Sequence, residues 1–239
     1  MPTVAEVMND AADTVSITIP TAWTSSTNKK TYRDLLRCLR QTVDDMQKRA
    51  DWPDLTLDYD VAGDGSASYD LPDAFKRVSR DDLAVYETGL RRGCIPIATN
   101  GDWTYLTETG TAANERYYRI SGTESAGYSI EFFQPLETGD TVTVSYVSRN
   151  WFTVSSVPGY LWTDEGAELM LPRETVFAGV VFRWRQSKGV AYLSYKVDYE
   201  KMLAGEANDA RGIRKISFGS PRPTRKPWDI PIPDYIPPA

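Results

Sequence analysis

Apolar side chains in residues 31–50 recur mostly at steps of three and four, which is the spacing of one face of an amphipathic helix. Pro53 ends that helix, because proline cannot continue the helical hydrogen-bond pattern. Residues 55–61 then alternate between apolar and polar side chains, which is the pattern of a half-buried strand. The chain must therefore bury both a helix face and a sheet face. The apolar residues of the two patterns are Tyr32, Leu35, Leu36, Leu39, Val43, Met46 and Ala50, followed by Leu55, Leu57, Tyr59 and Val61.

Further short strand candidates follow this change of period at fairly regular intervals. They cover residues 67–72, 94–99, 103–107, 116–120, 128–133 and 141–147. Short strands separated by glycine-rich turns are typical of a β-sandwich or a small barrel. We therefore predict an antiparallel β domain in the middle of the chain.

Helical spacing returns after Pro172, which suits the first turn of a helix, and Gly189 is a good terminator. A second helix is expected over residues 191–204. The simplest architecture is α+β, with a helical bundle formed by the N- and C-terminal helices and an inserted antiparallel β-sandwich or barrel. The expected parts are an N-terminal helical part (1–54), the β domain (55–160), the C-terminal helices that pack on the N-terminal part (161–206) and an extended arm (207–239).

The segment from Arg211 onwards contains 7 of the 15 prolines, so it cannot form a long helix or a central strand. Large apolar side chains interrupt the prolines, which a purely solvated linker does not require. We interpret the segment as an extended arm that docks on a partner; an arm that lies on its own domain, or a disordered tail, are the alternatives. The expected docking residues are Phe218, Trp228, Ile230, Ile232 and Tyr235.

The chain has no histidine, which removes the usual general base and the commonest metal ligand. Ser-His-Asp and Cys-His catalysis are therefore excluded, and we expect no enzyme activity and no cofactor. Two cysteines are too few for a disulfide scaffold or a zinc cluster. The net charge of −6 argues against a global attraction to nucleic acid or to an anionic membrane. The sequence shows no membrane-spanning run and no signal peptide, which predicts a protein kept in the cytoplasm or exported only within a larger particle.

Two charged clusters are candidate sites. The acidic stretch 58–65 is the best metal candidate, but an EF-hand loop would need acidic residues where Ala62 and Tyr69 stand, so we expect a solvated hairpin and no metal. Arg183, Arg185 and Lys188 lie near a predicted helix C-terminus, where the helix dipole favours cations. The functional alternative is a basic patch that contacts a partner or passing DNA.

The order and spacing of several motifs over residues 31–206 resemble a known family. These motifs are the strand end Tyr69-Asp70-Leu71-Pro72, Trp162 with Asp164, Leu171-Pro172 at a helix start, the Trp- and Arg-rich end of that helix, and Tyr199-Glu200 with Leu203-Ala204. The chain resembles the head-to-tail adaptor proteins of tailed bacteriophages, the group that includes the tail tubular protein A-like connectors.

This resemblance implies a structural protein that forms a ring, usually of twelve copies, below the portal. Such a ring bridges the portal to the next tail or nozzle component and lines the channel for double-stranded DNA, without sequence specificity. The C-terminal arm would reach the portal or a neighbouring subunit. The protein would be found at the head–tail junction of the virion after assembly in the host cytoplasm, with no membrane contact.

Two other function classes remain open at this point. A glycan-binding β-sandwich of a virion or surface protein would need an exposed sugar platform, and the candidate aromatic residues are Trp103, Tyr105, Tyr117, Tyr118 and Tyr128. Packing inside the strand core is the alternative for those side chains. A carboxylate-based hydrolase would need two acids that converge in a cleft, which the sequence does not show.

Overall fold

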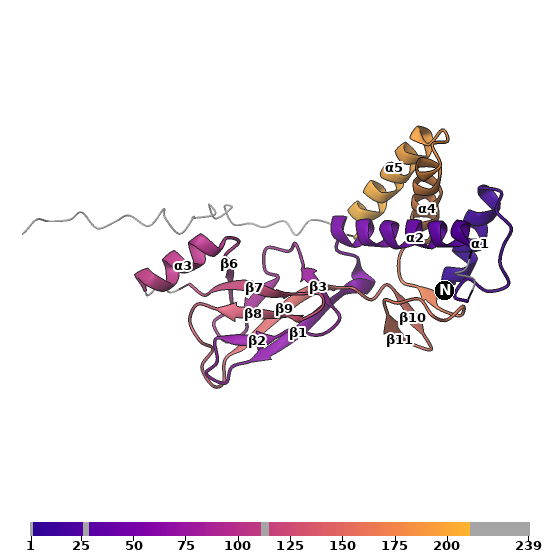
Figure 1. Cartoon of the computed structure of the whole chain (residues 1–239). Coiled ribbons are helices and arrows are strands. Elements are labelled where there is room, and N and C mark those ends of the chain that lie inside the picture. The colour runs from indigo at the N-terminus through magenta and orange to yellow at the C-terminus, as the bar shows by residue number, and fades with distance from the viewer. Residues whose placement is uncertain (1, 26–28, 111–114, 211–239) are drawn as a thin grey trace, which may run out of the picture. The chain divides into compact units, whose positions relative to one another are not determined.

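The computed structural model describes residues 2–25, 29–110 and 115–210, and it is a mixed α+β structure with five α-helices and mainly antiparallel sheets in that part (Figure 1). The α+β prediction is therefore confirmed. The described chain divides into two compact units. The first comprises residues 2–60, 72–84 and 143–210, and the second comprises 61–71 and 85–142. The four-part division expected from the sequence stays a prediction.

The helices of the first unit come from both ends of the chain. They are α1 (Val4–Thr14), α2 (Lys30–Arg49), α4 (Arg173–Ser187) and α5 (Leu193–Ala210). Helix α4 packs against α1, α2 and α5, so it lies at the centre of this group. The apolar stripe predicted for α2 is buried at Leu35, Leu39 and Met46, and it shares one core with Val180 and Tyr199. The predicted helical bundle is confirmed.

A small sheet completes the first unit beside the helices. It contains β10 (Phe152–Val154), β11 (Val157–Gly159) and β12 (Glu168–Leu169), and β10 pairs antiparallel with both neighbours. The β10–β11 turn consists of Ser155 and Ser156, both in the left-handed region with φ of 48° and 68°. Two consecutive positive φ values match the twist of a tight hairpin.

A larger sheet has the strand order β1-β9-β4-β5, and β3 also pairs with β9. Its strands are β1 (Thr56–Ala62), β3 (Phe75–Val78), β4 (Val85–Glu87), β5 (Arg92–Gly93) and β9 (Thr141–Ser148), and the short 3-10 helix η1 (Pro53–Leu55) precedes β1. Strands β1 and β9 contribute residues to both units. The closure of the strands into a sandwich or barrel stays a prediction.

The second unit contains the four-stranded sheet β2-β8-β7-β6. Its strands are β2 (Ser68–Asp70), β6 (Ile95–Pro96), β7 (Tyr117–Thr123) and β8 (Gly127–Phe132). The β7–β8 and β2–β8 pairs are antiparallel, whereas β6 and β7 are parallel. The buried side chains of Ile130 and Phe132 on β8 face the core of this unit.

The prediction of a strand over residues 103–107 is wrong, because these residues belong to helix α3 (Asn100–Thr109). The Thr99 side chain accepts a hydrogen bond from the Asp102 backbone N–H and caps the helix start, and Gly110 ends it with φ of 58°. Trp103 and Leu106 are buried and Tyr105 is exposed, which is a helical spacing of three. The caps and this spacing outweigh the strand preference of the aromatic residues. In the described ranges no helix is long and apolar enough to cross a membrane.

Candidate functional site

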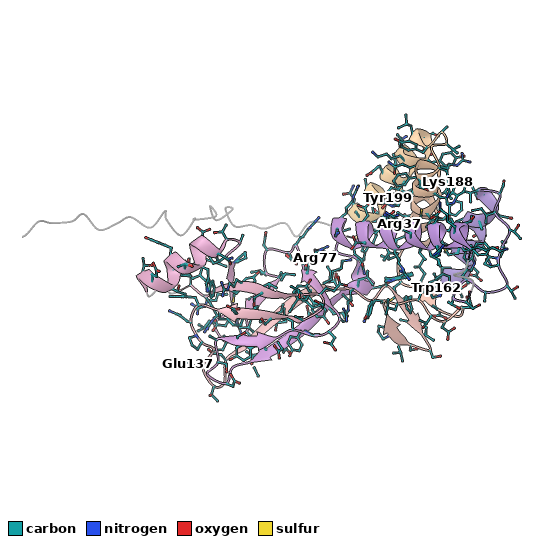
Figure 2. All side chains as sticks on the ribbon, in the orientation of Figure 1. Arg37, Arg77, Glu137, Trp162, Lys188 and Tyr199 are labelled. Atoms are coloured by element: carbon teal, nitrogen blue, oxygen red, sulfur yellow. The ribbon has the colours of Figure 1, made fainter. Side chains whose placement is uncertain are left out.

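The basic end of α4, where Lys188 is labelled in Figure 2, makes internal contacts in the structure. Arg183 donates from Nη2 to Asp45 Oδ2 at 2.9 Å and from Nε to Thr42 Oγ1 at 3.2 Å, both on α2. Its guanidinium also lies 5.7 Å from the ring centre of Tyr199 on α5. Arg183 therefore connects three helices.

Asp45 is the shared acceptor of this cluster. Its carboxylate accepts hydrogen bonds from Arg183, from the Tyr199 hydroxyl at 2.8 Å and from Arg49 Nε at 2.9 Å. Burial raises the pKa of Tyr199 well above its usual value, and the hydrogen bond to Asp45 adds to that shift. Tyr199 therefore stays a neutral donor to Asp45 at any physiological pH.

The other two cations of this helix end are also engaged. Lys188 forms an ion pair with Asp34 on α2, and this hydrogen bond holds the pKa of Asp34 below its usual value. Arg185 lies over the ring of Tyr195 at 4.2 Å. Arg183, Arg185 and Lys188 are thus linked to α2 and α5, and their predicted contact with a partner or DNA stays a prediction.

The predicted docking residues of the arm lie outside the described residues. They are Phe218, Trp228, Ile230, Ile232 and Tyr235.

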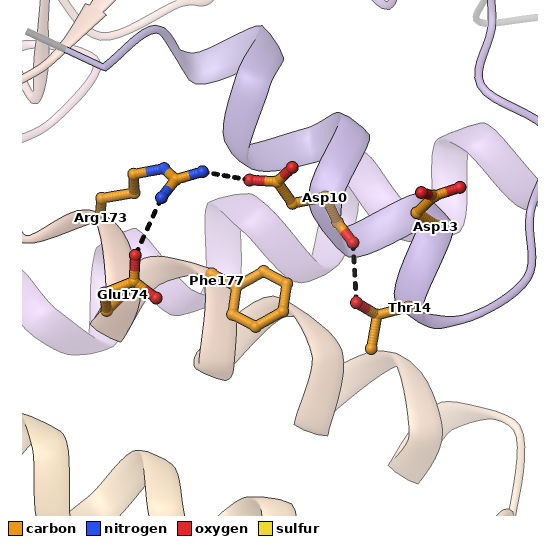
Figure 3. Close-up of a pocket in the computed structure, with 6 residues that line it drawn as sticks. All are labelled: Asp10, Asp13, Thr14, Arg173, Glu174 and Phe177. Atoms are coloured by element: carbon orange, nitrogen blue, oxygen red, sulfur yellow. Dashed lines mark hydrogen bonds and ion pairs between the residues drawn. The ribbon is translucent and has the colours of Figure 1, made fainter.

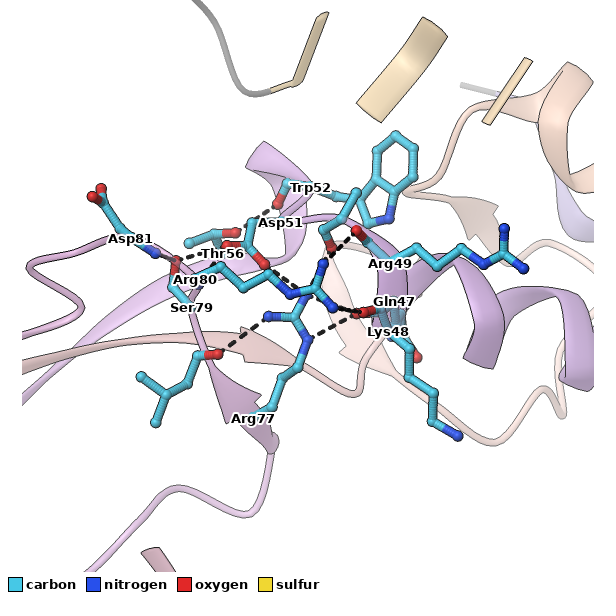
Figure 4. Close-up of polar contacts among 12 residues, drawn as sticks. Gln47, Lys48, Arg49, Asp51, Trp52, Thr56, Arg77, Ser79, Arg80 and Asp81 are labelled. Carbon is cyan, nitrogen blue, oxygen red and sulfur yellow. Dashed lines mark hydrogen bonds and ion pairs between the residues drawn. The ribbon is translucent and has the colours of Figure 1, made fainter. Parts of the chain in front are cut away.

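The end of α2 is held by two arginines that sequence reasoning did not single out (Figure 4). Arg77 donates to the carbonyl oxygens of Gln47 and Ala50, each at 2.9 Å from Nη2, and its Nη2 lies 2.6 Å from Asp51 Oδ1. Arg80 donates to the Lys48 and Arg49 carbonyl oxygens at 2.5 and 2.8 Å. The last carbonyl groups of a helix lack helical partners and carry negative partial charge, so cations stabilise them.

Asp51, just after α2, adds further contacts between the end of this helix and the segment after β3. It accepts hydrogen bonds from the Arg80 backbone N–H at 2.7 Å and from the Ser79 hydroxyl at 2.9 Å. Burial would raise the pKa of Asp51, but these bonds and the Arg77 guanidinium outweigh it and lower the value. The only sequence signal was the RVSR run of residues 77–80 at the end of a short strand, and this run does not identify a helix end as its target.

A second buried network lies within the other unit and was also missed. Glu87 is 1% exposed and accepts from Arg116 Nη2 at 2.9 Å and from Arg92 Nε at 2.8 Å. Arg116 also donates to Asp140 Oδ2 at 3.1 Å and to the Gln134 carbonyl oxygen at 3.0 Å. Burial would raise the pKa of Glu87, but the bonds from both arginines outweigh it and hold the pKa below its usual value.

A shallow pocket lies between α1 and α4 (Figure 3). It has a volume of about 280 Å³, and Asp10, Asp13, Thr14, Arg173, Glu174 and Phe177 line it. Arg173 pairs with Asp10 and, at 2.9 Å, with Glu174, and all three side chains are exposed. Solvated acids already paired with an arginine are suited to linking two helices, and they lack the burial that tunes a catalytic acid.

An open groove of about 700 Å³ runs along the β10–β11 hairpin. The guanidinium of Arg149 lies 4.1 Å from the ring centre of Tyr160 at this groove. Val157 and Leu161 in its lining are 66% and 59% exposed. Exposed apolar side chains that gather at one groove are typical of a protein contact surface.

The acidic hairpin and the candidate sugar platform have other roles in the structure. Asp60 accepts a hydrogen bond from Thr143 at 2.7 Å and Asp58 accepts one from Ser145, both across to β9. Among the described residues there is no group of three or more acids or cysteines placed to hold a metal ion. Trp103, Tyr117 and Tyr118 are buried, so the five aromatic residues do not form an exposed platform.

Comparison with known proteins gives one family match. Residues 2–217 match the family model described as SU10 adaptor protein. No curated protein sequence matches the chain.

Proposed function

Because the chain belongs to the SU10 adaptor protein family, a family of phage adaptors, we propose that it forms a ring that joins the portal to the tail and surrounds the passing DNA. The observation that carries the proposal is the extent of the match. It covers residues 2–217, which include every helix and strand of both units. The similarity to the adaptor family therefore extends over the whole described structure and is not limited to one motif.

The surface of the first unit supports an assembly role. Exposed apolar side chains lie at the β10–β11 groove, and α5 carries Leu193 and Val197 at 69% and 51% exposure. These two are one helical turn apart, so they form a short apolar strip on α5. A ring needs two different complementary patches on each subunit, because its contacts are head-to-tail.

The proposed partners are further copies of the chain in a closed ring, usually of twelve copies in the connectors that the sequence resembles, together with the portal protein and a downstream tail or nozzle component. The helical parts 1–54 and 161–206 would form the body of the ring, and the β domain over 55–160 would be its insertion. The arm over 207–239 would dock on the portal or on a neighbouring subunit through Trp228, Ile230, Ile232 and Tyr235, with Phe218 nearer its start. The protein would reside in the virion after assembly in the host cytoplasm, and it would act without catalysis.

Native mass spectrometry of the purified protein, alone and mixed with its cognate portal, tests the proposal. We expect a species with one portal and a fixed number of adaptor copies. A chain that stays monomeric and does not bind the portal at any mixing ratio would contradict the proposal.

A further inference from the structure

Helix α2 carries a stripe of exposed cations along its solvent face. Lys30, Arg33, Arg37 and Arg40 follow one another at steps of three, four and three, so they lie on one side of the helix. All four are exposed, and Arg37 is labelled on α2 in Figure 2. At 1.5 Å per residue the stripe extends over roughly 15 Å of helix axis.

The cations of this stripe have no ion-pair partner in the described part of the chain. None of the four side chains forms a hydrogen bond there either, although Lys30 and Arg37 help to lower the pKa of nearby Asp34. The acids of α2 form their ion pairs with other cations. Asp34 pairs with Lys188, Asp44 pairs with Lys48 and Lys76, and Asp45 pairs with Arg49 and Arg183. The stripe is therefore a concentrated positive surface on a chain whose net charge is −6.

The N-terminal part of the stripe is poorly placed for the helix dipole. The first turn of α2 has no acidic residue and no side-chain cap, and Lys29, Lys30 and Arg33 stand at or near this positive end of the helix dipole. Cations are unfavourable there. Residues that break a local rule are expected at functional or strained sites.

The composition of this face favours one class of partner. The large exposed apolar side chains of the described residues include none on α2. Protein interfaces are built around buried aromatic or aliphatic anchors, and this face offers only long, charged side chains. Guanidinium groups bind phosphate oxygens through two parallel hydrogen bonds, and duplex DNA presents about one charge per 1.7 Å of its axis.

We propose that Lys30, Arg33, Arg37 and Arg40 bind the phosphate backbone of double-stranded DNA without reading its sequence. This inference rests on the proposed adaptor function, which brings the chain next to DNA. Contacts made only to phosphates are salt-dependent and let a protein slide along the duplex. The α2 face would thus contact DNA during its passage without holding it at one place.

The test measures binding of a short fluorescein-labelled DNA duplex to the full-length protein, by anisotropy over a range of salt concentrations. The test variant is Arg33→Gln/Arg37→Gln/Arg40→Gln. The control variant, Arg91→Gln/Lys196→Gln/Lys201→Gln, removes three exposed cations elsewhere and changes the net charge equally. We expect the test variant to lose roughly tenfold or more in affinity at low salt. The slope of log affinity against log salt should fall by about 3, one for each phosphate contact removed.

Thermal unfolding of both variants and native mass spectrometry with the portal separate the outcomes. The inference stands if the test variant folds and joins the portal as the wild type does, but binds DNA less tightly than the control. Equal DNA binding by the two variants, or no DNA binding by the wild type at low salt, would overturn it. Loss of portal or ring assembly in the test variant, with DNA binding intact, would identify the stripe as a protein contact and overturn it too. A wild type that binds DNA but never joins the portal would contradict the adaptor proposal alone.

Discussion

Gly179 on α4 lies directly against Thr42 on α2, and a β-carbon on the glycine would come within 2.3 Å of the Thr42 methyl carbon. The same β-carbon would lie 2.9 Å from Cε2 of Tyr199 on α5. Three helices therefore meet at a point where only glycine leaves room. Arg183 lies one turn further along α4 and bonds to the hydroxyl of the same threonine.

Gly179→Ala should destabilise the helical part, because either α4 must move away from α2 or the Thr42 and Tyr199 side chains must shift. Overpacking of this kind costs about 1–3 kcal/mol. Gly205→Ala in α5 is the matched control, since a β-carbon at that position would meet nothing within 4 Å, and alanine should be neutral or stabilising by up to about 1 kcal/mol. Urea unfolding measures both variants; equal free energies of unfolding would contradict the close approach.

Arg183→Gln should cost about 1.5–3 kcal/mol, because Asp45 loses a charged hydrogen-bond donor in a half-buried cluster but keeps Arg49 and Tyr199. Lys188→Gln removes the ion pair with Asp34 near the surface and should cost less than about 1 kcal/mol. Thermal and urea unfolding compare the two variants under the same conditions. A Lys188 variant that is the less stable of the two would refute the assignment of Arg183 as the main link between the helices.

Glu87→Gln should lower stability at neutral pH by about 3–5 kcal/mol, because Arg116 would keep its buried charge and lose its main acceptor. The folded pKa of Glu87 lies below its ordinary value of 4.5. Its carboxylate therefore contributes stability above that value, and the contribution disappears as the pH falls through the lower folded pKa.

Melting temperatures of the wild type and of Glu87→Gln from pH 7 to pH 3 provide the measurement. The gap between the two proteins should narrow as the solution becomes acidic. A gap that is constant over this range would show that the ionisation of Glu87 does not contribute to stability.

Deletion of residues 211–239 should leave a folded protein, because α5 ends at Ala210 and the described cores lie before that point. Circular dichroism should show the same helix content and melting transition as the full chain. Mixing with the portal, followed by native mass spectrometry, should show no ring. Full assembly of the truncated protein would contradict the docking role proposed for the arm.

The helices of the first unit could be predicted because their signal is local. The stripe Leu35, Leu39, Val43, Met46 in α2 and the Pro172 and Gly189 ends of α4 depend on spacing and backbone restriction alone. Helix α3 was missed because Trp103 and Tyr105 also suit a strand. The stronger signals were Thr99 as a cap, Gly110 as a terminator, and the step of three between Trp103 and Leu106.

The polar contacts could not be predicted, because they join residues that are far apart in the sequence. Arg183 and Asp45 are separated by 138 residues, and their contact depends on how α4 lies across α2. Arg77 could be recognised only as a charge on a short strand, and its target is a set of backbone carbonyl groups that every helix end presents. The cations of α4 were visible in the sequence, but their partners on α2 and α5 were not.

The first unit is built from separate segments of the chain, so its parts are synthesised at different times. Helix α2 leaves the ribosome long before α4, which begins only at Arg173. At a synthesis rate of ~5–20 residues per second, the apolar face of α2 stays uncovered for roughly ten seconds before α4 is made. Its Cys38, Leu39 and Val43 are accessible to chaperones and to neighbouring nascent chains during that interval. The first unit can therefore offer a finished surface to a partner only after its last two helices, α4 and α5, have been made.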